Sequence, residues 1–104
     1  MKVTLYGHQF DGKDPLITGT DLRILRLKGN KTTAEMADAA AVKTRKTYEN
    51  WEAGKGQPNV NQFMALSVLC GFDPGRLLGE FARRGNTSLS GADHNLIQWE
   101  ECAI

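Results

Sequence analysis

Cysteine is scarce in this chain of 104 residues, which contains only Cys70 and Cys102. Two cysteines do not make the disulfide framework of a small secreted domain, and these two form no C-x-x-C pair of metal ligands. Neither His8 nor His94 stands at ligand spacing from either cysteine. We therefore expect free thiols in a reducing cytoplasm, no metal site and no cofactor.

Long apolar runs are also missing. No stretch approaches the roughly 20 apolar residues that cross a bilayer, and the start MKVTLYGHQF lacks the apolar core of a signal peptide. There is no Gly-rich phosphate loop, nucleophile elbow or Cys/His arrangement typical of catalysis. These absences argue against a membrane protein and against an enzyme.

The chain has almost no net charge, because 13 Lys and Arg oppose 12 Asp and Glu. The distribution is uneven: residues 19–56 hold eight cations and five anions, whereas residues 57–104 hold three cations and five anions. A basic middle segment is a candidate for contact with an anionic partner.

The length and the spacing of apolar residues favour one all-α domain at residues 19–84, between an N-terminal arm at 1–18 and a C-terminal tail at 85–104. KVTLY in the arm favours a short strand, and one hypothesis pairs it with LIQW at 96–99, within one chain or between two. The polar stretch GNTSLSGADHN predicts an irregular tail, which is a candidate contact for a dimer or a partner protein.

Five short helices are expected in the domain, since apolar residues recur three and four apart between turn signals. Thr20 or Asp21 is expected to cap the first helix, and Asn30 to end it in a left-handed conformation. Thr32 and Glu35 match a capping box at the start of the second. The residues expected to be buried are Leu22, Leu25, Met36, Ala37, Ala40, Tyr48, Trp51, Val60, Phe63, Leu66 or Ser67, Cys70, Leu77, Leu78 and Phe81.

The second and third expected helices, residues 33–40 and 44–53, are joined by a tight turn, and cations stand at the start of the latter. This arrangement lets one helix enter the major groove of DNA while its predecessor rests against the backbone. Polar side chains on the front of the later helix can meet base edges, and amides at the start of the earlier one can meet a phosphate. The candidate DNA-binding residues are Thr33, Lys43, Thr44, Arg45, Lys46, Glu49, Asn50 and Lys55.

Three stretches, LRILR, TTAEMADAAAV and TYENWEAGKGQPNVNQFMALSVLCGFDPGRLL, resemble the Xre-type, lambda-repressor-like helix-turn-helix family in their order and spacing. The resemblance covers roughly residues 20–79. It implies a five-helix bundle that binds operator DNA through its third helix, usually as a homodimer. It also implies an ion pair between Arg26 and Glu52, which would tie the first helix to the end of the third.

Two features depart from the family pattern. Ala41 stands where the family usually has Gly, and alanine enters a left-handed conformation less readily. Tyr48 and Trp51 fall one residue later than the usual register, so a longer turn is implied. Arg45 and Lys46 therefore remain equal candidates for the main base reader.

The sequence thus predicts a sequence-specific, double-stranded DNA-binding transcriptional regulator, either a repressor or an autoregulator. Because one helix reads only a few base pairs, we expect a homodimer on two half-sites. Two alternatives stay open. The chain is an antitoxin that binds a toxin through its arm or tail as well as its own operator, or it is a protein-interaction module that does not touch DNA.

Overall fold

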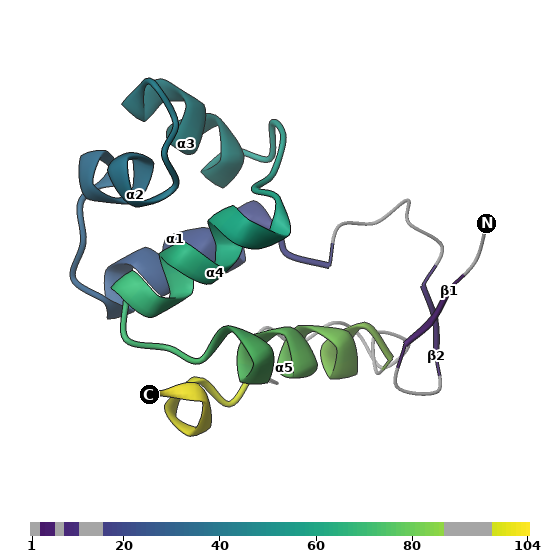
Figure 1. Ribbon diagram of the computed structural model, residues 1–104. Helices are drawn as coiled ribbons and strands as arrows, with labels where there is room; N and C mark the ends of the chain where they lie inside the picture. Colours follow the sequence, from purple (N-terminus) through teal and green to yellow (C-terminus); the bar gives the residue numbers. More distant parts are fainter. Residues whose placement is uncertain (1–2, 6–7, 11–15, 87–96) are drawn as a thin grey trace.

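Five α-helices make up most of the computed structural model, which describes residues 3–5, 8–10, 16–86 and 97–104 (Figure 1). They are α1 (Gly19–Lys28), α2 (Thr33–Ala39), α3 (Arg45–Glu52), α4 (Val60–Leu69) and α5 (Pro74–Asn86), and a short 3-10 helix, η3 (Trp99–Cys102), lies near the C-terminus. In Figure 1, α2 and α3 lie at one end of the molecule, α5 and η3 at the other, and α1 and α4 between them. No helix in the described ranges is long and apolar enough to span a membrane.

The arm contains a two-stranded antiparallel hairpin. Strands β1 (Val3–Leu5) and β2 (His8–Phe10) pair so that Val3 is opposite Phe10 and Leu5 is opposite His8. The strand expected in KVTLY is found, but the hypothesis that it pairs with LIQW within one chain is wrong, because its partner is β2 and Trp99 begins η3 instead. Pairing between neighbours in sequence requires a much shorter loop to be closed.

Reciprocal hydrogen bonds between side chain and backbone start the first two helices. The Asp21 amide donates to Thr18 Oγ1 at 3.1 Å, and the Thr18 amide donates to Asp21 Oδ2 at 2.8 Å. The cap expected at Thr20 or Asp21 is therefore wrong, because Thr18 is the cap and Asp21, the third residue of the helix, is its partner in the capping box. The box expected between Thr32 and Glu35 is confirmed by the corresponding bonds of 3.1 and 2.9 Å.

The chain leaves the first four helices through residues with positive φ, namely Asn30 (56°), Ala41 (57°), Gly54 (86°) and Gly71 (88°). After α2, the Ala41 amide donates to Asp38 O at 3.0 Å and the Val42 amide to Ala37 O at 3.1 Å, the hydrogen bonds of a Schellman motif. The left-handed ending expected at Asn30 is confirmed. Alanine is the unusual residue among the four, because its Cβ opposes this conformation.

The core lies between the helices and contains nearly all the residues expected to be buried. Val60 is an exception at 61% exposed. At about 100° per residue, Val60 falls on the same arc of α4 as Met64 and Val68, at the edge of the arc that buries Phe63 and Leu66. A spacing of three from Phe63 was therefore not enough to bury it.

The C-terminal segment belongs to this core. Ile97, Trp99 and Cys102 are 6%, 6% and 1% exposed, and the Trp99 ring packs against Phe72 and Phe81 with centroids 5.5 and 6.0 Å apart. The expectation that 85–104 lies outside the domain as an irregular tail is thus wrong for residues 97–104, and residues 85 and 86 are the last of α5. Its apolar side chains cover the surface of α5 that would otherwise face water.

Candidate nucleic-acid interface

Helix α3 buries one face. Tyr48 is fully buried and Trp51 is 7% exposed, and their rings meet edge to face with centroids 6.0 Å apart. The Tyr48 hydroxyl donates to the Leu22 carbonyl at 3.2 Å, which links α3 to α1. Burial raises the pKa of the Tyr48 phenol, so it remains a hydrogen-bond donor at neutral pH. The expectation that this aromatic pair is core, with α3 helical, is confirmed.

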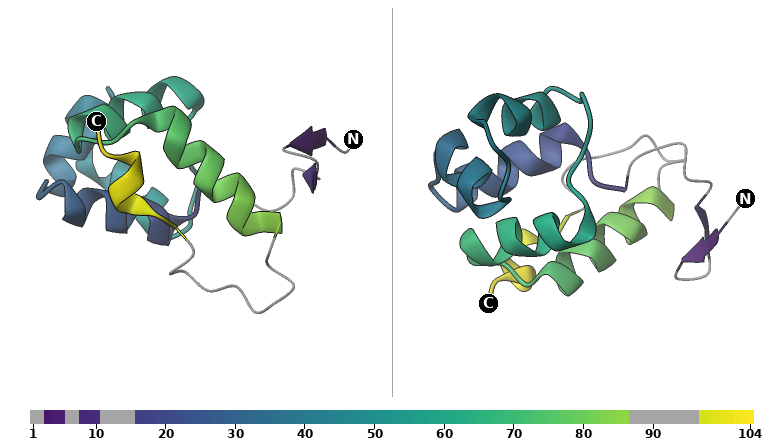
Figure 2. Two further views of the ribbon diagram at one scale, coloured as in Figure 1. Left: turned by 90° about the horizontal axis from the view of Figure 1, so that it is seen from below. Right: turned by 45° about the horizontal axis from the view of Figure 1, so that its top comes forward.

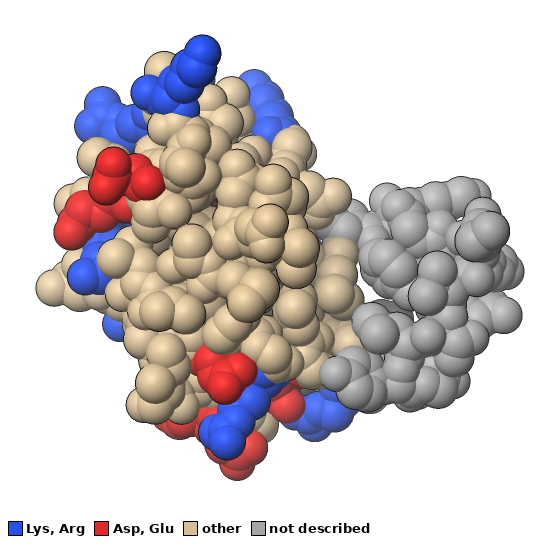
Figure 3. Space-filling view, in the orientation of Figure 1, with Lys and Arg blue, Asp and Glu red and all other residues tan. Residues whose placement is uncertain are grey.

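The opposite face of α3 is exposed and begins with cations. Lys43, Arg45 and Lys46 are all exposed, and Thr44 caps the helix by accepting from the Thr47 amide at 3.3 Å. In Figure 3, Lys and Arg side chains gather at the end of the molecule where α2 and α3 lie. At about 100° per residue, Lys46 is the cation of α3 that stands most nearly opposite the buried pair.

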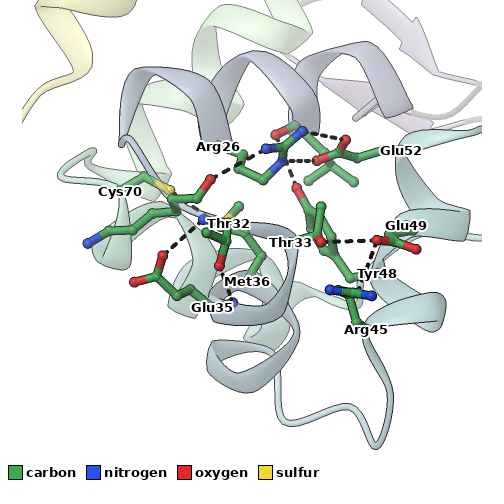
Figure 4. A network of polar contacts seen from close by, with 12 residues as sticks. Arg26, Thr32, Thr33, Glu35, Met36, Arg45, Tyr48, Glu49, Glu52 and Cys70 are labelled. Atoms are coloured by element: carbon green, nitrogen blue, oxygen red, sulfur yellow. Dashed lines mark hydrogen bonds and ion pairs between the residues drawn. The ribbon is translucent and has the colours of Figure 1, made fainter.

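Glu49 joins two other candidate residues, Thr33 and Arg45, in one network (Figure 4). Its Oε2 accepts from Thr33 Oγ1 at 3.0 Å and lies 3.3 Å from Arg45 Nε. Thr33 begins α2 and Arg45 begins α3, so the carboxylate ties the two helix starts together. The Arg45 side chain nevertheless stays 65% exposed.

The start of α2 is less suited to a phosphate than the sequence suggested. The amides of Thr32 and Glu35 are already bonded within the capping box, which places the Glu35 carboxylate at this helix start. Hydrogen bonding from Thr32 lowers the pKa of Glu35, which keeps the carboxylate charged at neutral pH. The Thr33 hydroxyl is engaged with Glu49. The Thr33 hydroxyl therefore acts on α3, and a phosphate contact at Thr33 stays a prediction that concerns its amide.

The remaining candidates lie toward the other end of α3. Asn50 is partly exposed, and its carbonyl accepts from the Lys55 amide at 2.8 Å. Lys55 is exposed in the loop beyond the helix. Since the eight residues of α3 span about 12 Å, Lys55 stands apart from Lys43 and Thr44. Seven of the eight candidates thus lie on α3 or directly beside its ends, and Thr33 meets them from the start of α2.

A bidentate ion pair fixes the end of α3 on α1. Arg26 Nε lies 2.7 Å from Glu52 Oε2, and a second guanidinium nitrogen donates to Glu52 Oε1 at 3.2 Å. The hydrogen bond to Glu52 raises the pKa of Arg26. At Gly19, an added Cβ would lie 2.3 Å from the Glu52 carbonyl oxygen, so only glycine permits this approach of α1. The expected ion pair is present, and it sets the direction of α3.

A side chain of α4 makes a hydrogen bond to the turn between α2 and α3. Gln62 Nε2 donates to the Ala40 carbonyl at 3.3 Å, next to the left-handed Ala41. We expected Ala41 to resist this conformation, but the Schellman hydrogen bonds hold it there. The strain costs roughly 1–2 kcal/mol.

Only one of the two contacts of Glu49 could be predicted from the sequence. The spacing of Arg45 and Glu49 is that of a helical i,i+4 ion pair and could have been recognised. The bond from Thr33 to Glu49 joins residues 16 apart and depends on the angle between α2 and α3. Among the described residues, no group of three or more His, Cys, Asp or Glu side chains could hold a metal ion.

Comparison with protein-family models, with curated proteins and with solved structures finds no match for this chain. The likeness to Xre-type domains therefore depends on the quoted stretches alone. What the surface can bind must be inferred from the arrangement of α2, α3 and their side chains.

Proposed function

We propose that the protein is a sequence-specific transcriptional regulator that binds double-stranded DNA, as a repressor or autoregulator in the cytoplasm. Helices α2 and α3 would form a helix-turn-helix of the lambda-repressor-like type. The observation that carries the proposal is the two-sided α3, with Tyr48 and Trp51 turned inward and the cations at its start turned outward. An α-helix fits the major groove, and its exposed polar side chains can then meet base edges.

The exposed face suggests a role for each side chain. Lys46 and Asn50 lie away from the core and are the proposed base readers, with Arg45 beside them. The Glu49 carboxylate limits the positions that the Arg45 guanidinium can take, so fewer rotamers are lost on binding. Lys43 and Lys55, at opposite ends of α3, are placed to meet phosphates on either side of the groove.

Selection of bound fragments from random double-stranded DNA tests this proposal. A regulator of this kind should enrich one short sequence, and a dimer should enrich it as an inverted repeat with half-sites about one helical turn apart. Affinity for the enriched sequence should fall moderately with salt, because a few phosphates are neutralised. A pool that stays random at low salt would refute DNA recognition.

The antitoxin alternative keeps the same DNA face and adds a protein partner. Because residues 97–104 pack in the core of their own chain, the arm at 1–18 is the better candidate for that contact. Copurification of a second polypeptide from the native host would support this alternative.

A further inference from the structure

An uncharged face covers the side of α4 that points away from the core. Residues 56–72 contain no Asp, Glu, Lys or Arg. The exposed positions within α4 are Val60, Asn61, Met64, Ala65 and Val68. In Figure 3, where α4 lies at the front, the described residues form a broad uncharged expanse, and the charged side chains lie around its edges.

Apolar side chains form a continuous stripe on this face. Val60, Met64 and Val68 are 61%, 47% and 56% exposed, and each is four residues from the next, so they line up along the helix. Ile104, 78% exposed, lies at the end of α4, where its amide donates to the Gly71 carbonyl at 3.0 Å. Single exposed apolar residues are common, but a contiguous stripe marks an interaction surface.

The stripe is not needed for packing within the chain. Phe63, Leu66 and Ser67 supply the buried side of α4 and are each at most 1% exposed. Each of the other helices carries at least one charged residue, and α4 carries none. An apolar surface left open in this way is stabilised only when a second molecule covers it.

We propose that the α4 face, defined as Val60, Asn61, Met64, Ala65 and Val68, is the interface between two copies of this chain. In a two-fold dimer the same patch faces itself, so any charge near the axis would meet a like charge. A face without charge avoids that repulsion, whereas a partner of different sequence would more often be matched by opposite charges. The lack of charge therefore favours a second copy.

The position of the α4 face also suits DNA binding. The role that we give to the dimer rests on that proposed function. Figure 1 and the right-hand view of Figure 2 show α3 at one end of the molecule and α4 in its middle, so α3 does not lie behind the α4 face. A two-fold axis running along the α4 face toward that end would place both α3 helices on the same side of the dimer. Both could then meet one DNA duplex at successive turns of the major groove. A standard interface buries about 800 Å² per partner, so the stripe would be its apolar centre and polar neighbours its rim.

The oligomeric state in the absence of DNA tests the interface. Sedimentation equilibrium should find the wild type dimeric and Met64→Glu monomeric, because two carboxylates would face each other across the axis. Leu27→Glu is the matched control: Leu27 is a helical apolar side chain, 59% exposed, on α1. It should remain dimeric. Unchanged helical circular dichroism in Met64→Glu, and a denaturation midpoint equal to that of the wild type at a protein concentration where the wild type is also monomeric, would separate loss of the interface from loss of the fold.

A cross-link tests the same contact independently. Ala65→Cys should form a disulfide-linked dimer on oxidation, whereas Ala53→Cys, also exposed, should not. The native Cys70 and Cys102 are buried and do not compete. A monomeric wild type, a Met64→Glu variant as dimeric as wild type, or a monomer that binds only a different protein through α4 would each overturn the proposal.

Failure of the interface and failure of the proposed function give different results. If the wild type is a dimer, Met64→Glu is a monomer and neither binds DNA, the interface stands and DNA recognition fails. If the wild type binds an inverted repeat and Met64→Glu binds it equally well as a dimer, DNA recognition stands and the interface fails. When both hold, Met64→Glu should lose about 100-fold or more in affinity for the full repeat and little for a half-site.

Discussion

Replacing Ala41 with glycine is expected to stabilise the protein. Ala41 has φ of 57°, and this conformation costs a residue with a Cβ roughly 1–2 kcal/mol. Glycine removes that strain but loses about 0.5–1 kcal/mol more backbone entropy on folding. Because Ala41 is exposed, no buried contact is lost. The net gain should be about 0.5–1 kcal/mol, or a few degrees in Tm for a domain of this size.

Urea denaturation followed by circular dichroism measures this gain. Ala53→Gly is the control, since Ala53 is exposed and ends α3 with φ of −83°, so glycine there should lose about 0.5–1 kcal/mol. Gly54→Ala should lose about 1 kcal/mol through strain alone, because φ is 86° and no atom lies within 4 Å of the added Cβ. If Ala41→Gly is destabilising by as much as Ala53→Gly, the left-handed turn does not exist in solution.

Three further outcomes test the packing. Trp51→Ala should destabilise the fold by about 3–5 kcal/mol; a variant that stays as stable and loses only DNA binding would mean that the faces of α3 are reversed. Arg84→Met should lower the free energy of unfolding, measured by urea titration, by about 3–5 kcal/mol, because the Asp21 carboxylate, 2% exposed, is left without its guanidinium partner. The control Arg83→Met changes an exposed side chain and should lower it by less than about 1 kcal/mol. Burial raises the pKa of the Cys70 thiol from 9.0 to about 11. The thiol therefore contributes to stability below pH 9, and this contribution is lost as the pH rises toward 11. The urea midpoint should fall over that pH range, and it should fall less in Cys70→Ala.

Local patterns predicted the helices well, because their signals lie within a few residues. The capping box of Thr32 and Glu35 and the left-handed Asn30 were both readable in this way. The expectation for the start of α1 is wrong although its capping box is equally local, because it places the cap at Thr20 or Asp21, whereas Asp21 is the partner of a cap at Thr18.

Contacts between distant segments could not be predicted from such patterns. Arg84 binds Asp21 across 63 residues, and Trp99, the first residue of η3, packs against Phe81 of α5, yet neither pairing has a local signature. For the same reason the exposed cations of α3 were found from the sequence, whereas the bond that holds Glu49 to Thr33 was not. Helical spacing predicts which side chains belong to the candidate site. The packing of α2 against α3 determines which of these side chains are in contact.

The most direct test of DNA recognition by α3 compares base discrimination in two variants that each remove one positive charge. Affinities of wild type, Lys46→Ala and Arg83→Ala are measured at one salt concentration for the selected sequence and for each of its single-base changes. Lys46→Ala should lose about 1–3 kcal/mol of discrimination at one base position, while Arg83→Ala should keep the wild-type pattern. Equal, sequence-independent weakening in both variants, or unchanged discrimination in Lys46→Ala and in Arg45→Ala, would contradict base recognition by α3.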